Sequence, residues 1–183
     1  MKSKNILRTL GLVFFLVFAT YTYSTCKASE PEDRGYIVKV GDMAPDFEVE
    51  LTDGSTVKLS DLKGKVVMLQ FTASWCGVCR KEMPHIESEI WQKYKNREDF
   101  FLIGLDYDEP KDKVLRFAET TGVSYPLGLD TKAGIFQKYA RPDAGVTRNV
   151  LIDRNGQIVM LTRLYNETEF SQLVKKIDEL MKK

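Results

Sequence analysis

Two short segments of almost continuous apolar character constrain the fold of this chain more than any other feature. They are Val66–Thr72 (VVMLQFT) and Phe100–Asp106 (FFLIGLD), both rich in residues that favour strands. Strands of this kind are expected where both faces of a sheet are covered. Between them, residues 76–95 have apolar residues at helical spacing. The sequence therefore predicts a strand–helix–strand unit within an α/β protein.

The rest of the chain adds hairpins and helices to this unit. Asp53-Gly54 predicts one hairpin turn and Asp153–Gly156 predicts another. Pro84 is expected to kink the long helix, because proline lacks the amide hydrogen that the helix uses. The expected strands are 46–50, 55–59, 66–72, 100–106, 146–152 and 157–164, and the expected helices are 60–64 (one turn), 76–95, 110–121, 131–139 and 166–181.

Capping residues predict the starts of three helices. Asp108 is expected to cap the helix after the second buried strand, and Asp130 or Thr131 the next one. Asn166, with Glu169 three residues later, resembles a capping box for the last helix. This order of elements predicts a central mixed β-sheet with helices on both faces and an N-terminal β-hairpin extension.

Composition narrows the class of protein. The chain has 183 residues, 43% of them apolar and 29% charged, and a formal net charge of +1. One domain of about 150 residues with a short appendage fits this length. The near-zero charge balance and the lack of a basic tract argue against nucleic-acid binding, so no nucleic-acid partner is expected.

The first 29 residues have the pattern of a secretory signal. Lys2, Lys4 and Arg8 precede an apolar run over Leu10–Ala19, and no acidic residue occurs in this segment. A signal h-region needs roughly 7–15 apolar residues, whereas a membrane span needs about 20. An uncleaved N-terminal anchor is the alternative, because the apolar and aromatic character continues to Tyr23.

Cys26 follows this apolar run and the small residues Ser24 and Thr25, a pattern that resembles a bacterial lipobox. Lipidation of Cys26 is therefore predicted, with cleavage after Ala28 as the alternative. Residues 30–37 are expected to form a polar tether and residues 38–183 the folded domain. We expect an exported protein of the bacterial cell envelope, on the periplasmic side, with a lipid anchor if Cys26 is modified.

The two other cysteines form a C-x-x-C motif, Cys76-Gly77-Val78-Cys79, with Trp75 before it at the predicted strand-to-helix junction. Free N–H groups and the dipole at a helix start favour an anion, so the pKa of Cys76 is expected to fall from about 8.5 toward neutrality. Cys79 lies one turn later and would resolve a mixed disulfide formed by Cys76. Trp75 would shield one side of the pair from water.

Two other uses of the motif fit the sequence less well. Zinc sites need four ligands, usually as two pairs, whereas the chain has no second cysteine pair and His85 is its only histidine. No metal site is therefore expected. A purely structural disulfide gains least from loop closure when the loop is as short as two residues.

Several segments resemble the TlpA/ResA-type thiol–disulfide oxidoreductases of the thioredoxin superfamily, which are exported bacterial proteins related to the redoxin group. The resemblance covers residues 38–183 and implies a thioredoxin-like fold, a nucleophilic Cys76 and a resolving Cys79, with no cofactor beyond their disulfide. It also implies protein disulfide or dithiol substrates and a membrane electron donor, which would make the protein a reductase. The segments are Gly41–Phe47 (GDMAPDF), Leu59–Val67 (LSDLKGKVV), Trp75–Cys79, Cys79-x-x-Glu82-x-Pro84 and Val150–Gly156 (VLIDRNG).

The resemblance further places the acidic side chain of Glu82 close to the dithiol, where it would tune thiol acidity and move protons. Gln70 occupies the position, six before the first cysteine, at which cytosolic thioredoxins keep a buried carboxylate. A neutral amide cannot accept the proton of Cys79, so this task would pass to Glu82 or to water. The alternative for Glu82 is a solvated surface acid.

The sequence departs from the family at the position where a cis-proline normally faces the dithiol. Thr147 occupies that position, and we expect the Val146–Thr147 peptide bond to be trans, because a non-proline cis bond costs roughly 2.5–4 kcal/mol. Thr147 would donate a hydrogen bond to the Cys76 thiolate, or Arg148 would stabilise the thiolate by its charge. The alternative is a strand-entry loop with a solvated Arg148.

Other classes of function fit the motif less well than protein disulfide exchange. A peroxiredoxin-like peroxidase needs a threonine three residues and a proline seven residues before its cysteine, and those positions hold Ala73 and Leu69. An exported copper carrier would need wider cysteine spacing and a distant histidine. A non-catalytic binding module of the same fold stays as an alternative. The sequence favours an exported protein disulfide oxidoreductase that acts as a reductase.

Overall fold

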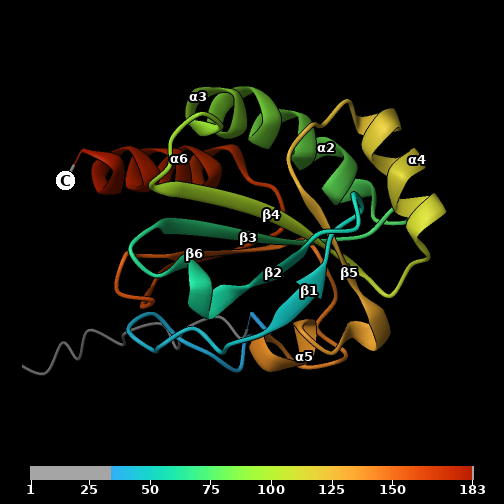
Figure 1. The fold of residues 1–183 in the computed structure, drawn as a ribbon, viewed down its shortest axis with the longest axis horizontal. Helices are drawn as coiled ribbons and strands as arrows, with labels where there is room; N and C mark the ends of the chain where they lie inside the picture. The colour runs from blue at the N-terminus through green and yellow to red at the C-terminus, as the bar shows by residue number, and fades with distance from the viewer. Residues whose placement is uncertain (1–33, 183) are drawn as a thin grey trace, which may run out of the picture. The chain divides into compact units, whose positions relative to one another are not determined.

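The computed structural model describes residues 34–182 and shows the predicted alternation of strands and helices (Figure 1). The strands are β1 (Glu48–Glu50), β2 (Thr56–Lys58), β3 (Val66–Thr72), β4 (Phe100–Tyr107), β5 (Leu127–Asp130), β6 (Arg148–Ile152) and β7 (Ile158–Arg163). The helices are the 3-10 turn η1 (Leu59–Leu62), α2 (Gly77–His85), the π-helical segment η2 (Ile86–Trp91), α3 (Gln92–Tyr94), α4 (Lys111–Thr121), the 3-10 turn η3 (Thr131–Ala133), α5 (Phe136–Tyr139) and α6 (Glu167–Met181).

The central sheet has five strands in the order β5-β4-β3-β6-β7. β3 and β4 are parallel, with Val66 opposite Phe100 and Thr72 opposite Asp106, and β4 and β5 are also parallel. β6 pairs antiparallel with both β3 and β7, so the sheet is mixed. β1 and β2 form the separate antiparallel hairpin that was predicted from Asp53-Gly54. The predicted fold class is confirmed.

Alternate residues of β3 pack into two cores, one on each face of the sheet. Met68 contributes to the core formed with α2, η2, α4 and α6, whereas Leu69 contributes to the core formed with α5 and β1. Figure 1 shows α2, α3 and α6 on one side of the sheet and α5 with the β1–β2 hairpin on the other. Every residue of β3 is buried, as its composition predicted. Side chains packed on both faces of the sheet therefore hold the C-terminal end of β3, from which the chain continues into the cysteine motif.

The long helix predicted over residues 76–95 is interrupted close to Pro84, as the sequence predicted. Pro84 lies inside α2, and the chain changes from α-helical to π-helical hydrogen bonding at Ile86. Since Pro84 has no amide hydrogen to donate, the regular hydrogen-bond ladder is broken in this turn. The first part, α2, is therefore a short helix that carries Cys79 and Glu82.

Two predicted helix starts are wrong. Asp108 does not cap α4, because it has a φ of 53° and its carboxylate accepts a hydrogen bond from the backbone N–H of Lys132. Pro110 occupies the N-cap position of α4 instead. The helix expected over 131–139 is broken, since Lys132 and Ala133 both have positive φ values. The carboxylate of Asp130 accepts instead from the backbone N–H groups of Ile135 and Phe136, where the remaining helix, α5, begins.

The domain begins earlier than predicted. Tyr36, which was assigned to the tether, forms a backbone bridge with Ala140 and donates its hydroxyl hydrogen to the carbonyl of Thr162 at 2.6 Å. Residues 34–37 are therefore part of the folded unit rather than of a free tether. The predicted signal, Cys26 and the first part of the tether lie outside the described residues. None of the helices described is sufficiently long and apolar to span a bilayer.

Candidate active site

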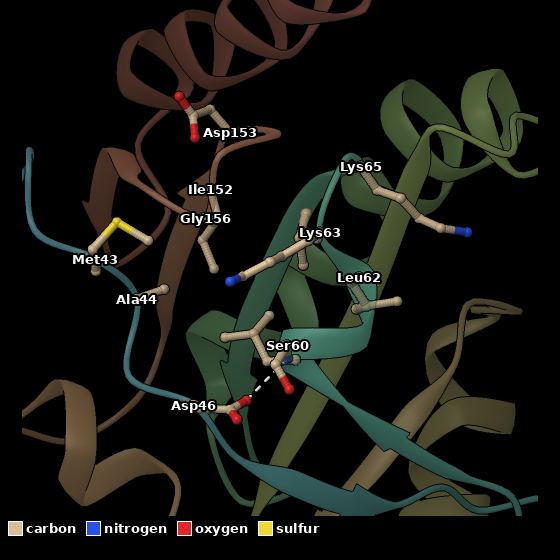
Figure 2. A pocket seen from close by; sticks show the side chains of 12 residues that line it. Met43, Ala44, Asp46, Ser60, Leu62, Lys63, Lys65, Ile152, Asp153 and Gly156 are labelled. Carbon is tan, nitrogen blue, oxygen red and sulfur yellow. Dashed lines mark hydrogen bonds between the residues drawn. The ribbon is translucent and has the colours of Figure 1, made fainter.

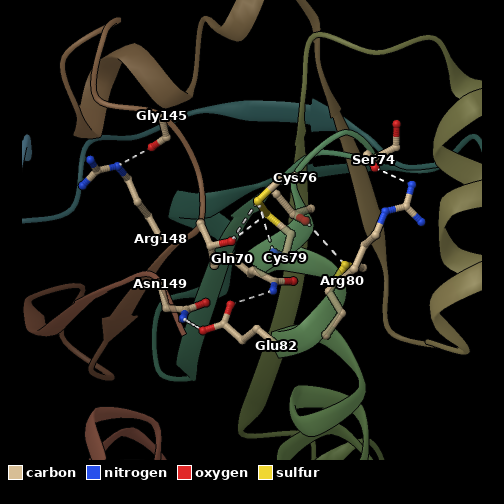
Figure 3. Close-up of a disulfide and its surroundings, with 12 residues drawn as sticks. Gln70, Ser74, Cys76, Cys79, Arg80, Glu82, Gly145, Arg148 and Asn149 are labelled. Atoms are coloured by element: carbon tan, nitrogen blue, oxygen red, sulfur yellow. Dashed lines mark hydrogen bonds between the residues drawn. A yellow bond between two sulfur atoms is a disulfide. The ribbon is translucent and has the colours of Figure 1, made fainter. Parts of the chain in front are cut away.

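Cys76 and Cys79 form a disulfide beyond the C-terminal end of β3, where the chain enters α2 (Figure 3). Cys76 is the N-cap residue of α2, and its sulfur accepts a hydrogen bond from the backbone N–H of Cys79 at 3.1 Å. Cys76 is 7% exposed, whereas Cys79 is fully buried. Cys76 therefore lies at a helix start, where an anion is favoured, and is the more exposed of the two sulfur-bearing residues.

Thr147 faces the disulfide from the loop before β6. Its hydroxyl oxygen is 2.6 Å from the sulfur of Cys79 and 3.4 Å from that of Cys76. The predicted trans bond is wrong: the Val146–Thr147 peptide is cis. The prediction considered only the local preference of a non-proline bond, whereas Thr147 is held by tertiary contacts on both sides, since its carbonyl also accepts from the N–H of Leu164 at 3.1 Å. Thr147 therefore faces the disulfide across a cis peptide bond, at the position where the resemblance predicts a cis-proline.

Arg148 is neither solvated nor directed at the sulfurs. It is fully buried, and its Nε donates to the carbonyl of Gly145 at 2.8 Å. Figure 3 shows its guanidinium turned away from Cys76, toward Gly145. Successive residues of a strand project to opposite faces, so Thr147 and Arg148 cannot both face the dithiol. Arg148 was predicted to stabilise the Cys76 thiolate by its charge, but its guanidinium donates to backbone carbonyls rather than to either sulfur.

Glu82 lies beneath the disulfide and is 1% exposed, so it is not a solvated surface acid. Its carboxylate accepts hydrogen bonds from Gln70 Nε2 at 3.1 Å and Asn149 Nδ2 at 2.7 Å (Figure 3). Burial raises the pKa of Glu82 to about 7, although the two amide hydrogen bonds oppose the rise. Gln70 is itself oriented by the hydroxyl of Tyr125, which donates to its Oε1 at 2.7 Å. The site therefore contains a buried carboxyl group that exchanges its proton near neutral pH.

Asn149 is a site residue that the sequence analysis missed. It follows Thr147 by two residues and so lies on the same face of β6, opposite Gln70 of β3. Its amide nitrogen donates to Glu82 and to the hydroxyl of Thr162. The alternation of side chains along the strand, counted from Thr147, is the signal that would have identified it.

The carboxylate of Glu109, which the sequence did not identify as a site residue, holds the turn before Trp75. The carboxylate of Glu109 accepts from the backbone N–H of Ser74 at 2.6 Å and from its hydroxyl at 2.7 Å. Arg80 of α2 donates to the carbonyl of Ser74 from the other side (Figure 3). Lys113 pairs with Glu109 at 2.5 Å. No local pattern predicts this contact, because Glu109 is 35 residues from Ser74.

Trp75 does not close the site against water. It is 60% exposed, and its indole meets the ring of Tyr107 edge-on, with the centroids 6.4 Å apart. Gly77 is also exposed and Val78 is half-buried. The expected shield is therefore partial, and the residues next to Cys76 form an accessible apolar surface.

A cavity of about 260 Å³ lies elsewhere, near the start of β3 (Figure 2). Asp46 there accepts a hydrogen bond from the backbone N–H of Ser60 at 2.9 Å. None of the site residues named above lines this cavity, so it does not belong to the disulfide site. Across residues 34–182, no group of three or more His, Cys, Asp or Glu side chains is arranged to hold a metal ion.

Comparison with known proteins agrees with this geometry. The sequence profile of the Redoxin family matches residues 39–177. The chain belongs to the Redoxin family. This Redoxin-family protein is a thiol–disulfide oxidoreductase of the thioredoxin superfamily, and its fold is thioredoxin-like.

The relatives of this Redoxin-family protein carry names of the same chemistry. It is 33% identical over 157 residues to the thiol-disulfide oxidoreductase ResA of Geobacillus kaustophilus (strain HTA426), which covers 86% of each chain. A solution structure from Bacteroides thetaiotaomicron, provisionally named a protein disulfide isomerase, is 68% identical with a TM-score of 0.79 and covers 81% of this chain and 94% of that one. A Chlorobium tepidum crystal structure, provisionally named thiol:disulfide interchange protein DsbE, is 29% identical with a TM-score of 0.69 and covers 78% and 98%.

Proposed function

We propose that this Redoxin-family protein is an exported reductase of protein disulfides in the bacterial cell envelope. The observation that carries the proposal is the position of Cys76 at the N-cap of α2, in contact with the N–H of Cys79 and the hydroxyl of Thr147. These donors and the helix dipole stabilise a thiolate in the reduced form. The fully buried Cys79 is within bonding reach of Cys76 but not of a large substrate.

In the reduced form the Cys76 thiolate attacks one sulfur of a substrate disulfide. The substrate S–S bond breaks, one substrate sulfur leaves as a thiolate and takes up a proton, and the other stays bonded to Cys76. Cys79 then loses its proton and attacks the sulfur of Cys76. The mixed disulfide breaks and releases the second substrate thiol, leaving the Cys76–Cys79 disulfide. Two electrons pass to the substrate, and the dithiol itself is the redox group.

The proton of Cys79 is assigned to Glu82. A carboxyl group whose pKa is raised to about 7 both accepts and releases a proton near neutral pH. Among the described residues Glu82 bonds to Gln70 and Asn149, not to either sulfur, so the proton reaches it through an intervening hydroxyl or solvent molecule. The hydroxyl of Thr147 is the group in contact with Cys79.

The direction and location of the reaction belong to the same proposal. The N-terminal signal pattern and Cys26 support export and lipid anchoring at the outer side of the membrane. A reductase in an oxidising compartment needs a continuous supply of electrons, which we assign to a membrane dithiol donor. Its substrates would be disulfides of exported proteins, and the names of its relatives support thiol–disulfide exchange as the chemistry.

The reduction potential of the Cys76–Cys79 pair tests this proposal. Equilibration of the full-length protein with glutathione buffers of known ratio gives the potential directly. A reductase is expected near −270 mV, as for thioredoxin, whereas a value near about −120 mV would make the protein an oxidant. A protein that never exchanges with the buffer would be a binding module rather than an enzyme.

A further inference from the structure

The side chain of Arg148 is fully buried on the face of β6 opposite the disulfide. Its Nε donates to the carbonyl of Gly145 and its Nη2 to that of Ala144, each at 2.8 Å, while its Nη1 donates to the carbonyl of Arg34 at 2.5 Å. Burying a guanidinium is unfavourable unless its donors are paired. In the described chain, three carbonyls from two separate segments provide that pairing.

Tyr36 covers the same guanidinium. The central carbon of the Arg148 side chain is 4.6 Å from the centroid of the Tyr36 ring, a distance at which the aromatic face attracts a cation. The hydroxyl of Tyr36 donates to the carbonyl of Thr162 at 2.6 Å and lies 3.1 Å from the carbonyl of Asn149, so contacts with β6 and β7 fix the ring in place. The N-terminal residues therefore hold Arg148 by a carbonyl and by an aromatic ring.

These contacts act on the loop that carries Thr147. Gly145 and Ala144 precede Thr147 by two and three residues, and Arg148 follows it directly. Binding both carbonyls from residue 148 ties the two ends of this five-residue loop together. On the opposite face, the hydroxyl of Thr147 lies 2.6 Å from the sulfur of Cys79. The Arg148 contacts and the hydroxyl that touches the sulfurs therefore belong to the same short loop.

Gly35 shows how closely the N-terminal segment packs on this loop. A Cβ atom at this position would lie 2.5 Å from the Cβ of Ala144 and 2.9 Å from Nη2 of Arg148. The φ of Gly35 is also +73°, a conformation that favours glycine. Only glycine at this position lets the N-terminal segment pack this closely against Ala144 and Arg148.

We propose that Arg148, held by Arg34–Tyr36, is a positioning residue that keeps the hydroxyl of Thr147 against the sulfurs and so sets the acidity and redox equilibrium of the dithiol. The inference rests on the proposed function, because it concerns how that dithiol is tuned. A hydrogen bond from Thr147 stabilises a thiolate and hence the reduced form. Loss of the Arg148 contacts therefore makes Cys76 less acidic and shifts the equilibrium toward the disulfide.

Two variants of the full-length chain test the inference without altering the sulfurs or Thr147. Arg148→Lys keeps the charge but not the planar fork that reaches three carbonyls, and Gly35→Ala pushes the segment away from Arg148. We expect each to lower the fraction of Cys76 thiolate at pH 7 about fivefold, and to shift the equilibrium constant with glutathione by a similar factor toward the disulfide. Peptide-resolved alkylation across pH reports Cys76 separately from Cys26.

Two control variants separate positioning from general damage. Arg154→Lys is the matched control, since Arg154 also donates to a backbone carbonyl, that of Leu180, at the other end of the sheet. This substitution should leave the Cys76 titration unchanged. Arg116→Lys changes an exposed arginine of α4 that pairs with Asp112, and it should also leave Cys76 unchanged. Circular dichroism establishes that each variant is folded.

The double variant Thr147→Val with Gly35→Ala identifies the route of the effect. If Arg148 acts through Thr147, adding Gly35→Ala to Thr147→Val changes the Cys76 titration no further. Full additivity would overturn the inference, as would folded Arg148→Lys and Gly35→Ala proteins with the wild-type titration. If Arg148→Lys does not fold, Gly35→Ala and the double variant decide alone. Failure of the proposed function would look different, since Cys76 would then be inert in the wild type.

Discussion

The hydroxyl oxygen of Thr147 lies 2.6 Å from the sulfur of Cys79, at the position where the resemblance to the thioredoxin superfamily predicts a proline. A proline side chain offers no hydrogen-bond donor, whereas this hydroxyl contacts both sulfurs of the pair. In the reduced protein it is able to donate to whichever sulfur is ionised. This chain therefore places a polar group against the dithiol, where the resemblance predicts an apolar one.

Thr147→Val removes the donor and keeps a side chain of similar shape. A hydrogen bond to a charged group is worth about 1.5 kcal/mol or more, so we expect the pKa of Cys76 to rise by about one unit. Thiolate absorbance of the reduced protein as a function of pH measures this change. Thr147→Ser, which keeps the hydroxyl, should titrate like the wild type. An unchanged titration of the valine variant would reject the hydrogen bond.

Glu82→Gln removes the proposed proton acceptor. We expect resolution of the mixed disulfide by Cys79 to slow by about 10²-fold, and the inflection of its rate near pH 7 to disappear. Stopped-flow oxidation of the reduced protein by a peptide disulfide measures both. Glu89→Gln changes an exposed acid of the same helical connection and is the matched control. If Glu82→Gln keeps the wild-type pH profile, another group accepts the proton.

Buried carboxyl groups also predict how stability depends on pH. Burial raises the pKa of Glu82 to about 7 from an ordinary 4.5, and burial with the nearby Glu109 raises that of Asp106 to about 8 from 3.8. The folded protein then binds more protons than the unfolded chain over this range. The stability that Glu82 and Asp106 contribute is fully present when the pH is below their pKa values in the unfolded chain. It is lost as the pH rises through 7 to 8, where these groups ionise in the folded protein.

Urea unfolding of the oxidised protein at pH 5 and pH 9 measures this loss. We expect the free energy of unfolding to fall with pH, and Glu82→Gln to reduce the fall by up to about 3 kcal/mol. Asp106→Asn should also reduce the fall of the unfolding free energy with pH. Neither oxygen of the Asp106 carboxylate has a hydrogen-bond partner among the described residues, so nothing there compensates its ionised form. Equal slopes in the wild type and both variants would show that these carboxyl groups are not perturbed.

The contact between Glu109 and Ser74 predicts a different kind of loss. Glu109→Ala removes the acceptor of both Ser74 hydrogen bonds and leaves a buried N–H unpaired, so we expect a loss of about 2 kcal/mol and a shift of Trp75 fluorescence. Ser74→Ala removes only the hydroxyl bond and should cost about 1 kcal/mol. Thermal unfolding measures both. If the two variants lose the same stability, the backbone contact contributes nothing.

Local pattern was sufficient to predict the frame of the site. β3 and β4 are visible in the sequence because burial on both faces makes a strand continuously apolar. The N-cap position of Cys76 follows from a strand that ends just before a helix begins. β5 was missed, since Leu127–Asp130 is too short to show a strand pattern.

The parts that were wrong depend on contacts between distant segments. The geometry of Thr147 and the direction of Arg148 are set by the sulfurs on one side and by residues 34–36 on the other. Residues 34–36 were predicted to belong to a polar tether, because the segment around Arg34 and Gly35 shows no apolar periodicity. Neither a cation–aromatic contact over more than a hundred residues nor a glycine required by close packing is visible in a local pattern.

The central claim, that Cys76 is the attacking sulfur and Cys79 the resolving one, is tested most directly by trapping. In a Cys26→Ser background, Cys79→Ser and Cys76→Ser variants are reduced and mixed with a protein disulfide substrate, and the products are analysed by intact mass spectrometry. The account predicts that Cys79→Ser accumulates a covalent mixed disulfide through Cys76 and that Cys76→Ser accumulates none. Equal trapping by both variants, or trapping by Cys76→Ser alone, would contradict it.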